Sequence, residues 1–412
     1  MLENNAMLTR RILLGSTMTL AAVPAVAQRR HPTRGPAAAA HGNQPDPSQP
    51  PPEPAQTPIG QVATDARWAC IVDFNTGTTL LEKNADEQMT PSSLTKLMTL
   101  YITFQRLAEG RLKLTDQLLV SKTAWRFGGS KMFVRVGDTV SVEDLLKGII
   151  VDSGNDACIV LAESISGSQE QFAGLMNETA KKLGMTHSHF MNPMGWPVPD
   201  HYMSARDIAT LASDLIRSFP QYYHYFGDKT FTYSNITQDN RNELVMRGTA
   251  DGLKTGHTEE GGFGLCASAE RDGRRVVIVL NGMPSSRARA EQGERLMAWS
   301  FANFEDVKLY AAGEAVDQAP VWLGASPSVP LVGLRDLVVT VPHGWRRQAK
   351  LQISYAAPIR APVAKGTKLG VLSLAGQGVP SMQLPLVAGA DVPKLGLPGR
   401  AMAVLTHYVT GG

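Results

Sequence analysis

The hydrophobic positions near the start of the globular region follow the alternation of a strand. Trp68, Cys70, Val72 and Phe74 alternate with other residues, residues 75–77 (Asn-Thr-Gly) have the composition of a turn, and an apolar stretch returns over residues 78–82. Period-two alternation on both sides of a short turn is typical of two paired antiparallel strands. This segment is predicted to be a β-hairpin.

The next apolar positions recur with the spacing of a helix. Residues 91–108 carry Leu94, Leu97, Met98, Tyr101 and Ile102 on one stripe, which predicts a helix with its start close to residue 93.

Two further helices are predicted on either side of residues 153–155. Ser141, with Asp144 three residues later, has the pattern of a helix cap. Asp156 opens a further apolar segment over residues 157–165. Residues 153–155 are therefore predicted to be a tight connection between two helices.

The order of the elements predicts an α+β fold. Apolar strands at 263–269 and 276–280 flank Asp272-Gly273, and a helix follows over 290–304. The series hairpin, helices, hairpin, helix favours an antiparallel sheet flanked by helices over a strictly alternating βαβ fold. Four short strand candidates after residue 312 predict a small C-terminal β-sandwich domain: 338–341, 351–355, 369–373 and 381–387.

The N-terminus has the pattern of an export signal. Arg10-Arg11 precedes an apolar run, and Ala25-Val26-Ala27 offers a cleavage site before Gln28. The Pro- and Ala-rich stretch that follows cannot bury enough apolar surface to fold. We therefore divide the chain into a signal peptide (1–27), a disordered tether (28–60), a catalytic domain (61–308), a C-terminal β domain (309–398) and a tail (399–412), and expect an exported, periplasmic protein.

Composition excludes some classes of function. The chain has 412 residues, 43% apolar and 19% charged, and a formal net charge of +3. Removing the leader, with two arginines and one glutamate, leaves +2. A nearly neutral chain without a basic cluster does not indicate nucleic-acid binding. The three cysteines, Cys70, Cys158 and Cys266, lie in apolar runs without metal-ligand spacing, so we expect no metal, no cofactor and no disulfide framework.

Three short motifs carry the candidate chemistry. Ser93 is the only serine followed by a lysine three residues later, Lys96. Residues three apart on a helix share a face, so the amine can take the proton of the hydroxyl. Residues 153–155 (Ser-Gly-Asn) and 254–256 (Lys-Thr-Gly) follow in order. Each motif alone is common by chance, whereas the ordered set is typical of active-serine enzymes that handle penicillin.

The sequence around these motifs resembles one family. Residues 90–99 (TPSSLTKLMT), 153–158 (SGNDAC) and 251–258 (DGLKTGHT) are similar to the penicillin-binding D-alanyl-D-alanine carboxypeptidases. The similarity spans about residues 64–305, and the β-rich tail resembles the C-terminal sandwich domain of that family. The resemblance implies a β-lactamase- or transpeptidase-like catalytic fold.

The resemblance also implies roles for individual residues. Ser93 would attack the carbonyl between two D-alanines and form an acyl-enzyme, and Lys96 would be its base. Burial beside the cationic Lys254 would keep that base neutral. Ser153 would pass a proton to the leaving amine, and Asn155 would hold Lys96 and the substrate amide.

The remaining candidates would bind the substrate. Lys254 and Thr255 would bind its terminal carboxylate, and Gly256 would leave the strand edge bare for a peptide. The backbone N–H groups of Ser93 and His257 would form the oxyanion hole. Arg289 and Arg241 are further carboxylate candidates, and a surface role for each is an equal alternative.

Four functions remain open from the sequence. The first is a carboxypeptidase acting on peptidoglycan stem peptides that end in D-Ala-D-Ala, with β-lactam antibiotics as covalent ligands. The alternatives are an endopeptidase that cuts cross-links, a class A-like β-lactamase and a non-catalytic wall-binding module. Residues 400–412 contain one arginine and modest apolar content, so weak association with the surface of the inner membrane also stays open.

Overall fold

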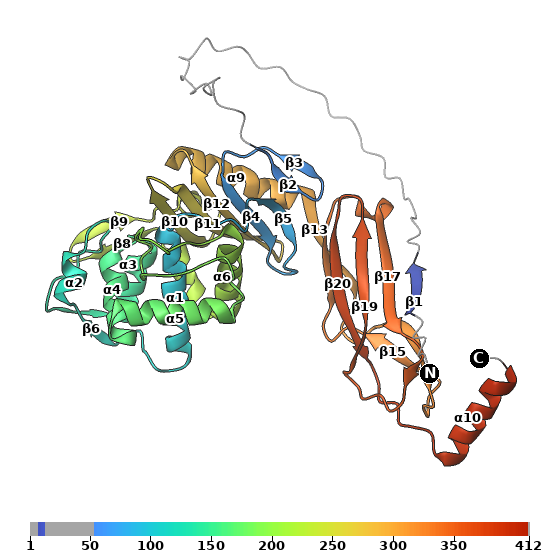
Figure 1. Ribbon diagram of the computed structural model, residues 1–412. Helices are drawn as coiled ribbons and strands as arrows, with labels where there is room; N and C mark the ends of the chain where they lie inside the picture. The colour runs from blue at the N-terminus through green and yellow to red at the C-terminus, as the bar shows by residue number, and fades with distance from the viewer. Residues whose placement is uncertain (1–6, 13–52, 411–412) are drawn as a thin grey trace, which may run out of the picture.

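The computed structural model describes residues 7–12 and 53–410, with side chains placed through residue 404 except at 7–12. Most of the predicted leader and tether lies outside these ranges. Two domains follow one another, an α+β domain and a β domain (Figure 1). Within the described ranges, no helix combines the length and the apolar content needed to cross a membrane.

A seven-stranded sheet forms the centre of the first domain, and its strand pairs are all antiparallel. The predicted fold class and both hairpins are confirmed. The strands, in spatial order, are β10 (Gly252–Thr258), β11 (Gly262–Arg271), β12 (Arg274–Met283), β4 (Trp68–Asp73), β5 (Thr79–Lys83), β2 (Ala55–Thr57) and β3 (Gly60–Val62). The last two differ from the prediction, because residues 55–60 were assigned to the tether and instead pair with this sheet.

Both faces of this sheet are covered. Alternate residues of the central strands belong to two separate apolar clusters, for example Cys70 on one face and Ile71 on the other. The helix α9 (Ser286–Asn303) packs on one face, and α6 (Ala205–Ser218) lies on the other with most of the remaining helices. Burial on both faces explains why these strands are apolar at nearly every position.

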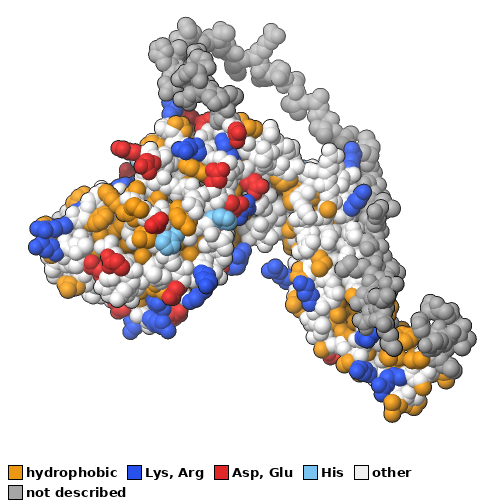
Figure 2. Space-filling view, viewed as in Figure 1, with side chains coloured by type: hydrophobic (Ala, Val, Ile, Leu, Met, Phe, Trp, Pro, Cys, Tyr) orange, Lys and Arg blue, Asp and Glu red, His pale blue; other side chains and the backbone are white. Residues whose placement is uncertain are grey.

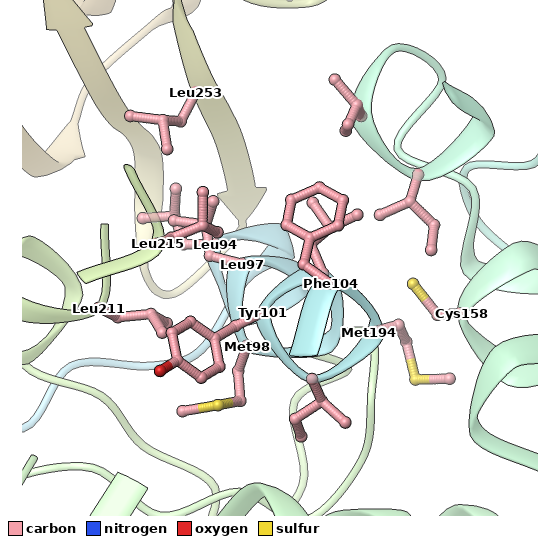
Figure 3. Close-up of a cluster of buried hydrophobic side chains, with 14 of the residues drawn as sticks. Leu94, Leu97, Met98, Tyr101, Phe104, Cys158, Met194, Leu211, Leu215 and Leu253 are labelled. Carbon is pink, nitrogen blue, oxygen red and sulfur yellow. The ribbon is translucent and has the colours of Figure 1, made fainter. Parts of the chain in front are cut away.

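The helix α1 (Lys96–Ala108) runs through the middle of the helical layer. Most of its side chains are buried, and Figure 3 shows them surrounded by Cys158, Met194, Leu211 and Leu253 from other elements. The predicted single apolar stripe therefore understates its burial, since a helix packed on all sides is apolar all round.

The other α-helices of the domain are α2 (Lys122–Arg126), α3 (Val142–Ile150), α4 (Asn155–Ser166), α5 (Gln169–Lys182), α7 (Pro220–Tyr223) and α8 (Glu243–Arg247). Two small two-stranded sheets pair β6 (Gln117–Leu119) with β7 (Thr139–Ser141) and β8 (Thr230–Tyr233) with β9 (Ile236–Asp239). The predicted cap at Ser141 is present, since its hydroxyl accepts the N–H of Asp144 at 3.0 Å. Hydrophobic side chains gather on the outer face of this lobe, with acidic and histidine side chains among them (Figure 2).

The second domain is built from strands with its own apolar core. A larger sheet contains β14 (Ala315–Trp322), β15 (Ser328–Val332), β17 (Ala349–Ala356), β18 (Ile359–Arg360), β19 (Lys368–Gly376) and β20 (Val379–Ala388), and a smaller one pairs β13 (Phe304–Tyr310) with β16 (Leu337–Pro342). Both sheets contribute to one core. At the edge of the larger sheet β1 (Met7–Ile12) pairs with β17, and α10 (Leu397–Thr410) ends the described chain.

The two domains are joined without a linker. Helix α9 ends at Asn303 and β13 begins at Phe304. Next to this joint the Arg274 guanidinium forms ion pairs with Asp73 at 2.9 Å and with Asp306, on β13, at 3.5 Å. It also donates to the carbonyl of Phe304 at 2.8 Å. A buried arginine therefore connects the catalytic sheet to the first strand of the β domain.

Candidate active site

The candidate nucleophile lies in a 3₁₀ turn rather than in the first turn of the helix. Ser93–Thr95 forms this turn, and α1 begins at Lys96, three residues after the predicted start near residue 93. The Ser92 hydroxyl caps the turn by accepting the N–H of Leu94 at 3.4 Å. The turn still leads directly into α1, so the free N–H groups at the helix start lie beside the serine.

Two glycines fix the position of this turn. A Cβ added at Gly195, whose φ is +83°, would overlap the carbonyl of Ser92 and lie 2.8 Å from Thr95 Oγ1. A Cβ added at Gly256 would overlap the side chain of Ser92. The space on the face of the sheet where a side chain of residue 256 would project is thus filled by Ser92. The strand β10 is the edge strand of its sheet, so a bare edge for a peptide at Gly256 stays a prediction.

Lys96 contacts Ser93 directly. Its Nζ donates to Ser93 Oγ at 2.8 Å, to Asn155 Oδ1 at 2.8 Å and to the carbonyl of Met194 at 2.9 Å. The side chain is 0% exposed. Burial lowers the pKa of this amine to about 8, and the Arg241 charge acts in the same direction. A substantial fraction is therefore neutral near physiological pH and can accept a proton.

The Ser-Gly-Asn motif connects α3 and α4, as predicted, although α4 begins at Asn155 rather than after Asp156. Ser153 is buried and has a φ of +59°, a backbone conformation uncommon for serine. Asn155 presents its oxygen to Lys96, and its amide donates to the carbonyl of Gly128 at 2.9 Å. The motif therefore holds the amine of Lys96 through the side chain of Asn155.

A loop at residues 128–130 supports Asn155, and the sequence analysis missed it. The backbone N–H of Asn155 donates to the carbonyl of Ser130 at 2.8 Å. Arg241 Nη1 donates to Ser130 Oγ at 2.6 Å. The Gly128-Gly129 pair was the feature of the sequence that could have indicated this loop, because a Cβ on Gly129 would come within 2.7 Å of Asn155 Nδ2. Arg241 is thus connected to Lys96 through Ser130 and Asn155.

Lys254 and Thr255 are buried on β10. Burial lowers the pKa of Lys254 well below its ordinary value, and the charges of Lys96 and Arg241 lower it further. The Lys96 and Lys254 charges oppose each other, as expected, and the Arg241 charge lowers the pKa of both amines. Two buried amines close enough to oppose each other disfavour the state in which both are charged.

The other two predicted substrate contacts have protein partners. Arg289 is buried, with an ion pair to Glu243 Oε1 at 2.6 Å and a hydrogen bond to the carbonyl of Arg241 at 3.3 Å. It therefore supports the segment that carries Arg241. The exposed His257 ring stacks on Phe263, with 4.0 Å between ring centroids, which leaves its backbone at the cleft.

A cavity of about 570 Å³ opens beside these groups. Ser93, Asn155 and Met194 lie along it, together with residues 129–130, 195–197 and 257–260. It is large enough for part of a peptide. Trp196 and the acidic pair Glu259 and Glu260 were not predicted, because nothing in their local sequence connects them with Ser93.

Fold and site together define a class of protein. A serine before a central helix is followed one turn later by a lysine of lowered pKa, which an asparagine holds, and a Lys-Thr-Gly strand lies in the same domain. These are the parts of an active-serine acyl-transfer enzyme of the penicillin-interacting kind.

Comparisons with known proteins identify the family. Residues 54–284 match the D-alanyl-D-alanine carboxypeptidase family of S11 peptidases, and residues 304–394 match the C-terminal domain of penicillin-binding protein 5. The chain belongs to this carboxypeptidase family, as the resemblance of its motifs implied.

Individual relatives cover both domains. The D-alanyl-D-alanine carboxypeptidase DacC of Escherichia coli is 38% identical over 84% of this chain and 89% of its own length. DacF of Bacillus subtilis is 32% identical over 82% and 88%. The crystal structure of penicillin-binding protein 5 from Haemophilus influenzae has a TM-score of 0.76 at 36% identity and covers 81% of this chain and 98% of that one.

Proposed function

We propose that this protein is a serine-type D-Ala-D-Ala carboxypeptidase that removes the terminal D-alanine from peptidoglycan stem peptides and binds β-lactams covalently at Ser93. The observation that carries the proposal is the 2.8 Å contact between Ser93 Oγ and Lys96 Nζ, with the amine buried and its pKa lowered to about 8. Membership of the family and the relatives named carboxypeptidases support the same reaction.

The first half of the reaction forms an ester. Ser93 Oγ bonds to the carbonyl carbon between the two D-alanines, and its proton passes to neutral Lys96. The oxyanion lies between the backbone N–H groups of Ser93 and His257. When it collapses, the C–N bond breaks, and the leaving amine receives the proton from Lys96 through Ser153, which leaves Lys96 neutral again. Lys254 and Thr255 hold the terminal carboxylate of the departing D-alanine.

The second half returns the free enzyme. Water adds to the ester carbon while Lys96 takes its proton, and the bond to Ser93 Oγ then breaks as the serine is protonated again. Asn155 keeps Lys96 in contact with Ser93 in both halves. Arg241 acts on this site through its charge and its hydrogen bond to Ser130. Arg289 holds the segment that carries Arg241.

Two measurements test the proposal. Intact mass spectrometry after exposure to benzylpenicillin should show one added ligand mass, lost in Ser93→Ala. A pentapeptide should release free D-alanine faster than a cross-linked dimer is cut, which separates a carboxypeptidase from an endopeptidase. An unshifted mass, or a shift that persists in Ser93→Ala, contradicts the assignment.

The location of the protein is part of the same proposal. The charged start, apolar run and Ala-Val-Ala site of residues 1–27 support export to the periplasm. Exposed Leu397 and Met402 on α10, with a single arginine in this helix, support weak contact with a membrane surface. Cell fractionation of the tagged full chain, with and without residues 397–412, tests both points.

A further inference from the structure

The strand β10, which carries Lys254 and Thr255, lies at the edge of the catalytic sheet. Among the described strands, β11 is the only one that pairs with it. The Lys254 amine is buried, and its one hydrogen bond to a described residue is to the carbonyl of the adjacent Thr255, at 3.3 Å. The position of this amine in the site therefore depends on where the backbone of β10 lies.

The surroundings of Lys254 tend to push this strand away. The charges of Lys96 and Arg241 both lower the pKa of Lys254, so all three cations lie within reach of one another. Like charges that share a buried site repel each other. An edge strand that carries such a group requires an anchor beyond its single ladder of hydrogen bonds.

An anchor is present at Asp251, the residue before β10. Arg275, on β12, donates from Nη1 to Asp251 Oδ1 at 2.9 Å, and its Nη2 lies 2.8 Å from Asp251 Oδ2. The Tyr223 hydroxyl, at the end of α7, donates to the same Oδ1 at 2.7 Å. The Arg275 guanidinium also lies over the Tyr223 ring, 5.2 Å from its centroid. A two-pronged contact between arginine and carboxylate fixes orientation as well as distance.

The same groups connect the start of β10 to β11. Arg275 Nη1 donates to Ser268 Oγ at 2.9 Å, and the backbone N–H of Asp251 donates to the carbonyl of Ser268 at 2.9 Å. Ser268 is opposite Gly252 in the strand pair. A Cβ added at Gly252 would come within 2.7 Å of the Tyr223 hydroxyl, so Tyr223 packs directly against the strand. The start of β10 is therefore held from three elements, β11, β12 and α7.

We propose that Asp251, Arg275 and Tyr223 form a clamp, called here the strand clamp, that positions Lys254 and Thr255 for the terminal carboxylate of the substrate. None of the three clamp residues lines the cavity beside Ser93, so they are positioning residues that act through β10. This inference rests on the proposed function, because that function assigns the carboxylate to Lys254 and Thr255.

A matched pair of thioesters tests the clamp. Both substrates carry the N-benzoyl-D-alanyl group and present the same carbonyl to Ser93. The leaving group of one is thioglycolate, which ends in a carboxylate, and that of the other is ethanethiol, which does not. The ratio of the two kcat/KM values, measured by thiol release, reports how well the carboxylate is held. A variant that is only less stable lowers both values together and leaves this ratio unchanged.

The clamp variants should differ in the size of their effect on this ratio. Asp251→Ala removes every side-chain contact of the clamp with the strand and should lower the ratio about tenfold. Asp251→Asn keeps an oxygen that accepts from Arg275 and Tyr223, so it should lose less than Asp251→Ala. Tyr223→Phe removes one hydrogen bond and should lower the ratio about two- to fivefold. The control is Glu291→Gln, which breaks an exposed ion pair with Arg287 on α9 and should keep the ratio.

The outcomes separate this inference from the proposed function. A ratio that stays at the wild-type value in Asp251→Ala and in Tyr223→Phe overturns the clamp, while cleavage by the wild type still supports the proposed function. Melting curves show which variants are folded, and if Asp251→Ala is not, Tyr223→Phe, which keeps the ion pair, decides. A wild type that does not prefer the thioglycolate ester overturns the carboxylate role of Lys254 and Thr255, and the clamp with it. Folded wild type that cleaves neither thioester and is not acylated by benzylpenicillin overturns the proposed function itself.

Discussion

The lowered pKa of Lys96 predicts how the reaction with benzylpenicillin depends on pH. Only the neutral amine can take the proton of Ser93, and neutral amine increases as pH rises through its pKa of about 8. The rate constant for acylation should therefore increase about tenfold per pH unit below 8 and level off above it.

The size of the effect follows from the burial of Lys96. Lowering the pKa from an ordinary 10.5 to about 8 costs the charged form about 3 kcal/mol, relative to water. About 9% of the amine is neutral at pH 7, compared with about 0.03% for an ordinary lysine. Between pH 6 and pH 9 acylation should rise about 90-fold.

Variants of the neighbouring arginine separate charge from contact. Arg241→Gln removes a cation that lowers the pKa of Lys96, so the midpoint should move to higher pH. Ser130→Ala breaks the contact between Ser130 and Arg241 but keeps the charge, so its midpoint should stay near 8. Arg247→Gln, which removes an exposed arginine at the end of α8, is the control.

Stopped-flow measurement with a fluorescent penicillin, corrected with Ser93→Ala, gives the profile. A rate that is flat between pH 6 and 9 would refute Lys96 as the base, and a rate that keeps rising towards pH 10.5 would refute its lowered pKa. An unmoved midpoint in Arg241→Gln would refute the assigned role of that charge.

Three further predictions follow from the site. Gly195→Ala should abolish acylation and lower the melting temperature, because the added Cβ would overlap Ser92 at the start of the turn that carries Ser93. The control is Gly137→Ala, which has a similar φ of +85° and open space beside it, so it should show only the backbone strain of about 1–2 kcal/mol. Burial raises the pKa of Asp152 to about 7, so the protonated side chain stabilises the fold at low pH, and this stabilisation is lost as the pH rises from about 4 through 7. In Asp152→Asn the free energy of unfolding should therefore change less with pH over this range. An unchanged slope would contradict the assignment. Asn155→Asp puts a carboxylate on Lys96 and should move the acylation midpoint above 8, a shift that a purely structural role of Asn155 would not produce.

The parts of the site that depend on local spacing were predictable from the sequence. Ser93 and Lys96 are one turn apart along the chain, so their contact needs only a helical backbone between them. The apolar strands and the cap at Ser141 were also local patterns. The three motifs were brought together by resemblance, because their order along the chain does not give their distance in space.

The parts that depend on packing were not predictable. Ser130 and Trp196 reach the site on loops whose sequences carry no catalytic pattern. The glycine at 256 has its role because Ser92 packs against it from another element. Arg289 could not be assigned its partner Glu243, 46 residues away, from the sequence alone. Strands β2 and β3 escaped prediction because each has only three residues beside a Pro-rich segment.

The joint at Asn303 and Phe304 connects the β domain to the catalytic domain directly. This joint has no spare residues, and Arg274 bridges Asp73 on the catalytic sheet and Asp306 on the first strand of the β domain. The molecule is elongated, with α10 at the end of the β domain remote from the sheet of the catalytic domain (Figure 1). The helix α10, for which we propose weak contact with a membrane surface, therefore lies at the far end of the molecule from the catalytic domain.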